Sequence, residues 1–466
     1  MNLKKFLILS VLIGLAIPVF AHQKEFYYLA LFAIISCGYF YFKKRSPTLI
    51  DLLILILITI PLHTFRLGTE ENFIRLSEIA FLPLFFWWLA ARFLNKAKEP
   101  IKMRKEFLLL IGYLVINIAS LKNSMLPVIS IKRIMILAYL FVFTYIICDA
   151  LNSKNKINTI TKSMIVISGL SGIIALLQCI FPQLLIFNRV PIGSIFGVTL
   201  YRAGVGWHDT NYYAIYIAMN ATLTLSYILS SNKNSRFLKL FFALQIIGLL
   251  ATFSRTVIMS LILSSLYVLN YFGKKRIVIT SLIAIMVTVG LVASSYLFIY
   301  KQSPFLASVV YRVADKQNLE KQPTLIMGHR YAAFIANWDM FIAHPVLGVG
   351  PFMAMYNFDK YRPAGYKYPI PWLASHNQYL QLLAEKGIFG FILFIWFLFM
   401  IIKNTNRAIK KSSDTEYKAS LIGLKASIFV CLIASLALET SYELQFWLTC
   451  GIIMAIVNLI NKEADA

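Results

Sequence analysis

The segment IVISGLSGIIALLQCIF, residues 165–181, contains no charged side chain over its whole length. Comparable, largely apolar runs cover residues 49–62, 79–94 and 277–299. Each run approaches or reaches the roughly 20 apolar residues that an α-helix needs to cross a bilayer. Their hydrophobic residues are continuous, whereas the strands of a membrane barrel alternate between polar and apolar positions. These runs therefore predict membrane-spanning helices.

The composition of the whole chain agrees with this interpretation. Of the 466 residues, 59% are hydrophobic and 14% are charged, whereas soluble proteins have about 45–50% and about 25%. We expect an all-α integral membrane protein, a polytopic helical bundle of about 12–14 transmembrane helices. The expected spans cover residues 5–20, 26–42, 48–62, 74–94, 107–120, 128–150, 160–181, 209–230, 237–253, 256–272, 277–299, 388–402, 420–438 and 445–460.

The net charge of +25 is explained by the positions of the basic residues. Alternate loops contain the excess of Lys and Arg: KKRS from 43, ARFLNKAKEPIKMRK from 91, SKNKINTITK from 153, SNKNSRFLK from 231, GKKR from 273 and KNTNRAIKKSSDTEYK from 403. Because cytoplasmic loops are enriched in basic residues, we expect these loops and both termini in the cytoplasm. The charge is thus a topology signal, and nucleic acid is excluded as a partner.

The first apolar segment has a second interpretation. Lys4, Lys5 and the VFA at residues 19–21 also suit a cleaved signal peptide. We expect the segment to be retained as the first helix, and its removal would leave the orientation of the later spans unchanged.

The external segments divide the chain into four regions. We expect N-terminal transmembrane helices at 1–181, central transmembrane helices with short external motifs at 182–299, an external loop with an amphipathic helix at 300–387, and C-terminal transmembrane helices at 388–466. The five cysteines fall in predicted spans without the spacing of a metal site. The external segments also lack an Asp-x-Asp pair, so we expect no metal and no cofactor.

All six histidines lie outside the expected cytoplasmic face, and His376 has the most specific context. In SHNQYLQLLAEKGIFG, which starts at residue 375, His376, Asn377 and two glutamines stand at the start of an apolar helix. The reference pKa of an imidazole, about 6.5, suits a proton acceptor near neutral pH. An amphipathic entry helix would explain the apolar residues without requiring His-Asn in its first turn. A catalytic and a structural role for His376 both stay open at this point.

Two external arginines are candidates for binding a phosphate. Arg255 is the only charged residue of the tight turn ATFSRTVIM, and a guanidinium suits bidentate phosphate binding. Arg330 opens the amphipathic segment GHRYAAFIANWDMFIAHPVLGVG, whose apolar stripe could face the membrane or the bundle. Snorkelling to the lipid headgroups would also explain either arginine. Asp339 is either solvated or a partner of Arg330, and the GVG at 348–350 is interpreted as a turn.

A third external motif, YRAGVGWHDTNYYA from residue 201, combines glycines with polar side chains. Arg202 precedes the glycines, and Asp209 and Asn211 follow them at a predicted helix start, where one of them has an ordinary role as N-cap. Arg133, beside Lys132 near the outer start of its span, either snorkels or helps to hold an anionic lipid headgroup.

Taken in order, the motifs RAGVGWHDTNYYA, FSRTVIM, GHRYAAFIANWDMFIAHPVLGVG and SHNQYLQLLAEKGIFG resemble the O-antigen ligase and O-antigen polymerase superfamily of bacterial envelope glycosyltransferases. The resemblance covers residues 200–395, and the earlier spans agree only in hydropathy. It implies that Arg255, Arg330 and His376 are catalytic. It also implies a substrate-binding role for Asn377, the second residue of the His-Asn motif. The residues themselves add Arg202, Asn211, Asp209 and Arg133 as candidates for substrate binding. The family more often has a proline before the asparagine near residue 209, where this chain has DTN, so the role of Asp209 stays open.

The resemblance also implies a reaction and a compartment. Members use a lipid-linked glycan donor, usually on undecaprenyl pyrophosphate, without a metal. The acceptor is lipid A core or a similar envelope molecule in ligases, and a second lipid-linked repeat unit in polymerases. Such proteins lie in the bacterial inner membrane, among membrane lipids, with the active site facing the periplasm. One dominant external loop favours the ligase, because it suits the capture of one large acceptor.

A transporter of lipid-linked sugars is the remaining alternative. It would be expected to have inverted repeats, helices broken near mid-membrane or charges deep within its spans. In this sequence the notable external charges gather at the outer rim of the predicted bundle.

Overall fold

The computed structural model describes residues 48–62, 66–68, 73–94, 104–181, 191–195, 198–207, 209–231, 235–274, 328–363, 366 and 373–465. The spans expected at 5–20, 26–42 and 277–299 lie outside these residues, and so does the question of whether the first segment is retained.

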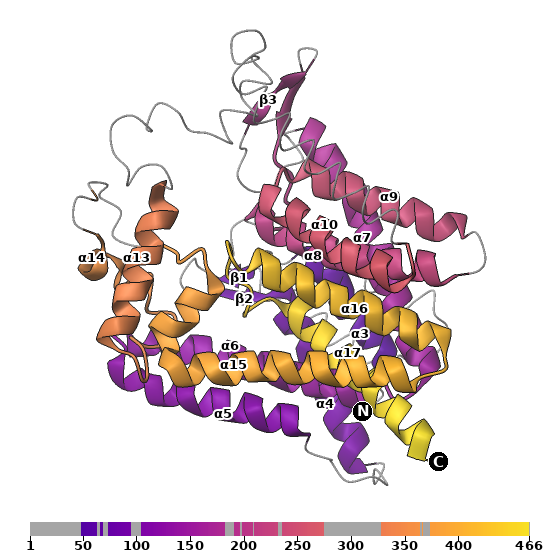
Figure 1. The fold of residues 1–466 in the computed structure, drawn as a ribbon, viewed down its shortest axis with the longest axis horizontal. Helices are drawn as coiled ribbons and strands as arrows, with labels where there is room; N and C mark the ends of the chain where they lie inside the picture. Colours follow the sequence, from indigo (N-terminus) through magenta and orange to yellow (C-terminus); the bar gives the residue numbers. More distant parts are fainter. Residues whose placement is uncertain are drawn as a thin grey trace.

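The described residues form mainly helices (Figure 1). The α-helices are α3 (Leu49–Thr59), α4 (Leu76–Leu94), α5 (Lys105–Ala119), α6 (Pro127–Ala150), α7 (Lys154–Ile180), α8 (Thr210–Ser230), α9 (Arg236–Ala251), α10 (Arg255–Tyr271), α13 (Gly328–Ala343), α14 (Phe358–Tyr361), α15 (Gln378–Lys411), α16 (Thr415–Ala434) and α17 (Leu444–Asp465). Two 3₁₀ turns, η2 (Ile60–Leu62) and η3 (Ser120–Asn123), extend α3 and α5.

Every expected span that falls within the described residues coincides with one of these helices. Among the described residues, eight helices are long and apolar enough to cross a membrane. Two shorter apolar helical segments, α3 with η2 and α10, accompany them. The protein is therefore an all-α, polytopic membrane protein, as the apolar runs predict.

Two short antiparallel hairpins interrupt the helices. β1 (Arg66–Gly68) pairs with β2 (Phe73–Arg75), and β3 (Pro191–Ile195) pairs with β4 (Val198–Tyr201). Sequence analysis did not predict them, because strands this short leave little alternation to detect. The second hairpin matters for the site, since β4 leads directly into Arg202.

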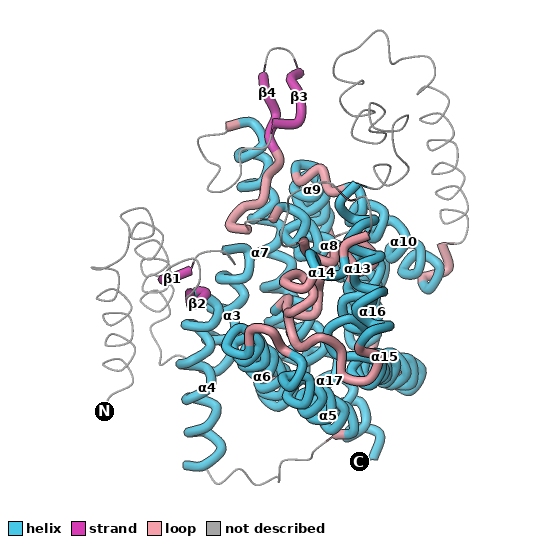
Figure 2. Tube along the Cα trace, turned by 90° about the vertical axis from the view of Figure 1, so that its left-hand side faces the viewer, coloured by secondary structure: helices cyan, strands magenta, loops and turns pink. Residues whose placement is uncertain are grey.

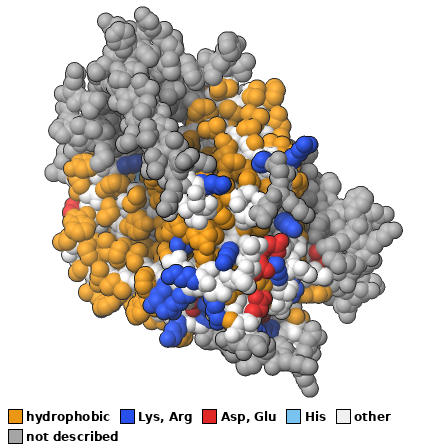
Figure 3. Space-filling view, turned by 45° about the vertical axis from the view of Figure 1, so that its right-hand side comes forward, with side chains coloured by type: hydrophobic (Ala, Val, Ile, Leu, Met, Phe, Trp, Pro, Cys, Tyr) orange, Lys and Arg blue, Asp and Glu red, His pale blue; other side chains and the backbone are white. Residues whose placement is uncertain are grey.

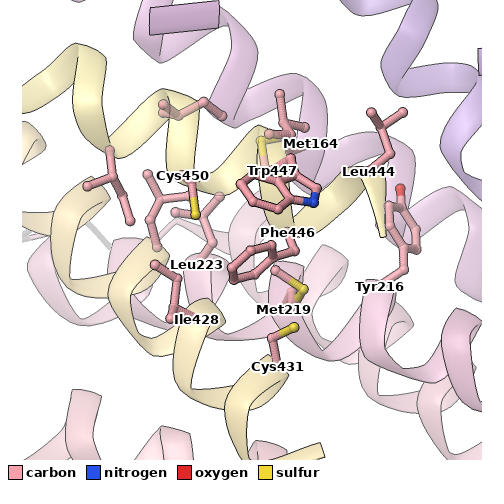
Figure 4. Packing of buried hydrophobic residues seen from close by; sticks show 14 of the residues in the cluster. Met164, Tyr216, Met219, Leu223, Ile428, Cys431, Leu444, Phe446, Trp447 and Cys450 are labelled. Atoms are coloured by element: carbon pink, nitrogen blue, oxygen red, sulfur yellow. The ribbon is translucent and has the colours of Figure 1, made fainter. Parts of the chain in front are cut away.

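The helices α7, α8, α16 and α17 meet in a tightly packed core (Figure 4). A Cβ at Gly423 of α16 would lie only 2.8 Å from the Cα of Leu223 in α8, so these two backbones approach closely. Trp447 of α17 is fully buried, and its indole N–H donates to the Ser441 carbonyl at 2.7 Å. In lipid, where burial of apolar surface adds little, such packing and hydrogen bonding hold helices together. This packing fixes the positions of the ends of α7, α8, α16 and α17 relative to one another.

The two ends of the bundle differ in their chemistry. The helices α13 and α14 lie at one end, and the C-terminus lies at the opposite end (Figures 1 and 2). Lys and Arg side chains gather on the face turned toward the C-terminal end, beside a hydrophobic flank (Figure 3). Ion pairs there include Lys154 with Asp414 and Arg104 with Glu106. We name the end with α13 and α14 the site end.

The helix α15 is broken at Gly387, whose φ of 63° lies in the left-handed region. The turn with the GVG sequence at 348–350 packs into this break, where the Val349 N–H donates to the Ala384 carbonyl at 2.8 Å. The interpretation of GVG as a turn is thus confirmed. The span expected at 388–402 begins directly after the break, and the helix continues beyond it to Lys411.

Candidate active site

The motif that starts at residue 201 leads into the first turn of α8 at the site end. Asp209 is the N-cap, because its Oδ1 accepts a hydrogen bond from the backbone N–H of Asn211 at 2.8 Å. The side-chain carbonyl of Asn211 accepts in turn from Nη2 of Arg202 at 3.1 Å. Arg202 also donates from Nε to the backbone carbonyl of Thr252 at 2.9 Å. Arg202 is therefore held between α8 and the turn that joins α9 to α10.

That turn places Arg255 at the N-terminus of α10. Phe253 adopts a φ of 52°, which turns the chain sharply between the two helices. Ser254 donates from its hydroxyl to Oδ1 of Asn211 at 2.7 Å, so the turn is tied to α8. The side chain of Arg255 is exposed. A cation beside the free N–H groups of a helix start favours the binding of an anion.

His376 has a φ of 50°, in the left-handed region that residues other than glycine adopt in only a few per cent of cases. The next residue, Asn377, is the N-cap of α15, and its Oδ1 accepts from the N–H groups of Tyr379 and Leu380, both at 3.0 Å. Residues in such conformations persist only where their surroundings enforce them, and they cluster at functional sites. The side chain of His376 is half-buried.

The connection between α16 and α17, residues 435–443, is hydrogen-bonded to residues on both sides of His376. On one side, the Ser375 N–H donates to Oε1 of Glu439 at 3.2 Å. On the other side, Oε1 of Gln378 accepts from two backbone N–H groups of the connection, both at 2.8 Å. These hydrogen bonds fix the backbone before and after His376, and so they help to hold its left-handed conformation.

Two carboxylates of this connection were missed by sequence analysis. Burial, followed by the nearby Glu385, raises the pKa of Glu439 to about 7. Burial also raises the pKa of Glu443 to about 8, although Arg75 acts in the opposite direction. Both side chains are therefore partly protonated near neutral pH. Tyr212 of α8 shares a hydrogen bond with the backbone of Glu439, which links the connection to α8 as well.

Sequence motifs gave no signal for these two glutamates, because they lie four residues apart in one short connection between two apolar runs and match none of the motifs. The one available signal was their position, in a short external connection that follows the His-Asn motif in the chain. Within the described residues, no group of three or more His, Cys, Asp or Glu side chains is arranged to hold a metal ion.

Arg133 lies near the same connection and stacks on aromatic rings. Its guanidinium carbon lies 3.5 Å from the centroid of the Phe352 ring and 5.7 Å from that of Tyr442. Glu439 and Glu385 are the acidic groups that face it. Arg133 is half-buried in this position, whereas the neighbouring Lys132 is exposed.

A buried ion pair lies beneath the site, at the break in α15. Nζ of Lys386 lies 2.8 Å from Oε2 of Glu385, and both side chains are 1% exposed. Nε2 of Gln381 donates to Oε1 of Glu385 at 3.0 Å, and the Gln381 side chain also hydrogen-bonds Glu439. A chain of polar groups therefore runs from the connection of α16 and α17 down to Gly387.

Arg330 lies in the first turn of α13 with an exposed side chain, and Asp339 further along α13 is also exposed. The same helix contributes Ala332, Ala336 and Met340 to a small core that includes Ala384 of α15. Arg330 is thus at the site end, but α13 is separate from the group of residues that hydrogen bonds link around Asn211 and Glu439. That group contains Arg202, Asp209, Asn211, Ser254, Tyr212, Glu439, Ser375 and Asn377.

Residues 240–395 match the family model described as O-antigen ligase. The resemblance to the O-antigen ligase and polymerase superfamily is confirmed. The matched segment contains Arg255, Arg330 and His376, whereas Arg202 and Arg133 lie before it. No curated protein matches the chain.

Proposed function

We propose that the protein is a membrane glycosyltransferase of the O-antigen ligase type. It would transfer a glycan from an undecaprenyl-pyrophosphate donor to a hydroxyl of lipid A core or a similar envelope acceptor. The observation that carries the proposal is the position of His376, which is held in a left-handed conformation at the same bundle end as Arg202 and Arg255. The match of residues 240–395 to the O-antigen ligase family supports the reaction class.

In this proposal, His376 acts as the general base. The acceptor oxygen attacks the anomeric carbon of the donor sugar and forms the new glycosidic bond, while the bond from that carbon to the phosphate oxygen breaks. The lipid pyrophosphate leaves with the electron pair, and the imidazole takes the hydroxyl proton. A positioned general base contributes roughly 10²–10⁴-fold to the rate. Direct displacement inverts the configuration at the anomeric carbon.

The arginines stabilise the leaving group, which gains negative charge as the bond breaks. Arg255 offers an exposed guanidinium at the start of α10, and Arg202 is fixed nearby by its bonds to Asn211 and Thr252. Arg330 contributes a further cation from α13. Preorganised charges of this kind are worth several kcal/mol in the transition state. They replace a divalent cation, so the proposed reaction needs neither a metal nor a cofactor.

The proposed location follows from the two ends of the bundle. Lys and Arg side chains gather toward the C-terminal end, and the enrichment of cytoplasmic loops in Lys and Arg supports a cytoplasmic location of this end. The site end then faces the periplasm across the bacterial inner membrane, and both termini are cytoplasmic. The arginine groups would meet the pyrophosphate where the lipid headgroups lie.

The test uses purified protein in liposomes with a lipid-pyrophosphate glycan, with lipid A core or with no added acceptor. The decisive variant is His376→Asn, because asparagine tolerates the left-handed region better than alanine and so preserves the backbone. The matched control is His344→Asn, which replaces a histidine at the end of α13. We expect transfer to the core by the wild type and the control, and a loss of at least about 100-fold in His376→Asn.

Other outcomes would select among the alternatives. Chain extension in the absence of core would identify a polymerase that uses the same site. Full activity of His376→Asn would show that another group takes the proton. Donor binding with no transfer to any acceptor would favour a transporter of lipid-linked sugars.

A further inference from the structure

The helix α13 has an unusual distribution of side-chain sizes between its two faces. The face toward α15 consists of small residues and one methionine, Ala332, Ala336 and Met340, all at most 1% exposed. The outward face has large apolar residues at helical spacing, which continue into the following turn. We name these residues, Ile335, Trp338, Ile342 and Val346, the outer stripe.

The side chains of the outer stripe are so exposed that contact with water would be unfavourable in free energy. Trp338 is 49% exposed, Ile342 is 60% exposed and Val346 is 52% exposed. An amphipathic helix of a water-soluble surface turns its large apolar residues inward and its polar residues outward. The opposite arrangement in α13 indicates that a second apolar medium covers its outward face.

The position of α13 identifies that medium. It lies across the long part of α15 at the site end, rather than alongside it (Figure 1). The turn after α13 is fixed to the start of α6, where the Ser130 hydroxyl donates to the Pro351 carbonyl at 2.7 Å. Asn123 likewise donates to the Gly348 carbonyl at 2.7 Å.

The surface beside this attachment is an exposed apolar flank at the start of α6, a helix long and apolar enough to cross a membrane. Its exposed residues are Met125 at 61%, Val128 at 66%, Ile131 at 45% and Met135 at 66%. The turn that ends the outer stripe is therefore attached beside exposed apolar residues of a helix that is long and apolar enough to cross a membrane. This position beside an apolar flank favours lipid over a protein partner.

We infer that α13 is an interfacial helix, with its outer stripe inserted among the acyl chains of the leaflet at the site end. A helix with one apolar face lies in the boundary between headgroups and chains. Trp338 suits that depth, because tryptophan is enriched at membrane interfaces. Arg330, in the first turn, would then lie at the level of the phosphates. This inference concerns a lipid contact and stands apart from the proposed reaction.

The test measures contact with lipid directly at one residue. The variants are Ile342→Cys on the outer stripe and Lys360→Cys on the exposed face of α14, each bearing a nitroxide label. Cys37→Ser is included in both, because the other four cysteines are buried. The full chain is placed in vesicles of phosphatidylethanolamine and phosphatidylglycerol. Collision rates of the label are measured with oxygen, which concentrates in the chains, and with a water-soluble nickel chelate.

We expect oxygen collisions at residue 342 to exceed nickel collisions by at least about threefold, and the ratio to be reversed at residue 360. Nickel collisions at 342 as frequent as at 360 would overturn the inference. Equal protection of 342 from both reagents would also overturn it, because a protein segment would then cover the stripe. Neither readout requires transfer activity, so failure of the proposed reaction would leave this result interpretable.

Discussion

The backbone N–H of Ser375 donates to Oε1 of Glu439 at 3.2 Å, which joins the residue before His376 to the connection between α16 and α17. The same connection contacts α8 through Tyr212. A carboxylate outside every sequence motif thus positions the candidate base. The protonation state of Glu439 should therefore influence both the stability of the protein and the position of His376.

Stability should fall as pH rises, because of Glu439 and Glu443. Their pKa values in the folded protein, about 7 and about 8, are raised from the ordinary value of 4.5 for a glutamate. Between pH 4.5 and these values the folded state binds more protons than the unfolded state, so stability is fully present below pH 4.5 and is lost as pH rises through about 7 and about 8. Melting temperatures in detergent from about pH 5 to about pH 8 measure the effect.

Glu439→Gln is the informative variant for this prediction. It keeps an oxygen that can accept from Ser375 and removes the titration. We expect a flatter dependence of melting temperature on pH, with a higher value than wild type at the alkaline end. Glu385 opposes ionisation of Glu439 and Arg133 favours it. A wild-type slope in Glu439→Gln would show that other groups account for the dependence.

Asn211 should control activity through the two groups that it orients. Its Oδ1 accepts from the Ser254 hydroxyl at 2.7 Å and from Arg202 at 3.1 Å. Asn211→Ala removes this acceptor, so the turn before Arg255 is released, and a displacement of about 1 Å can cost about 100-fold in kcat. Asn211→Asp keeps the acceptor and should retain most of the activity. Equal losses in both variants would point to a role for the amide N–H₂ instead.

The helices were predictable from sequence because span length and hydropathy are local properties. The start of α15 at His376-Asn377 and the turn at Arg255 could also be found, since each has its polar residues within a few positions. The contact between Asn211 and Ser254 joins residues 43 positions apart, and that between Ser375 and Glu439 joins residues 64 apart. Patterns in a short stretch of sequence do not show that residues so far apart in the chain are in contact. The large residues of the outer stripe likewise recur at helical spacing in the sequence. That spacing predicts an apolar helix face, but it does not distinguish a face that contacts lipid from one that contacts protein.

The buried pair of Glu385 and Lys386 should be costly to break and less costly to remove as a whole. Lys386→Met leaves a carboxylate in a site that is 1% exposed, which typically costs about 3–5 kcal/mol in the free energy of unfolding. The double variant Glu385→Gln, Lys386→Met removes both charges and should recover much of that loss. Unfolding in detergent of the two single variants and the double variant gives the coupling energy. Additive losses would contradict a direct interaction.

Gly387 should not tolerate a side chain, because the break in α15 depends on it. Its φ is 63°, and a Cβ would lie 2.2 Å from the Val346 carbonyl oxygen. Gly387→Ala should therefore force the turn at 348–350 away from α15 and lower the free energy of unfolding by at least about 2 kcal/mol. The control is Gly112→Ala in α5, where the new Cβ meets only methyl groups of Leu393 at 3.6 Å and beyond. We expect Gly112→Ala to be neutral or stabilising, because alanine favours helix more than glycine does. If the two variants melted alike, the break would be a consequence of packing elsewhere, and the start of α15 with His376 would not depend on it.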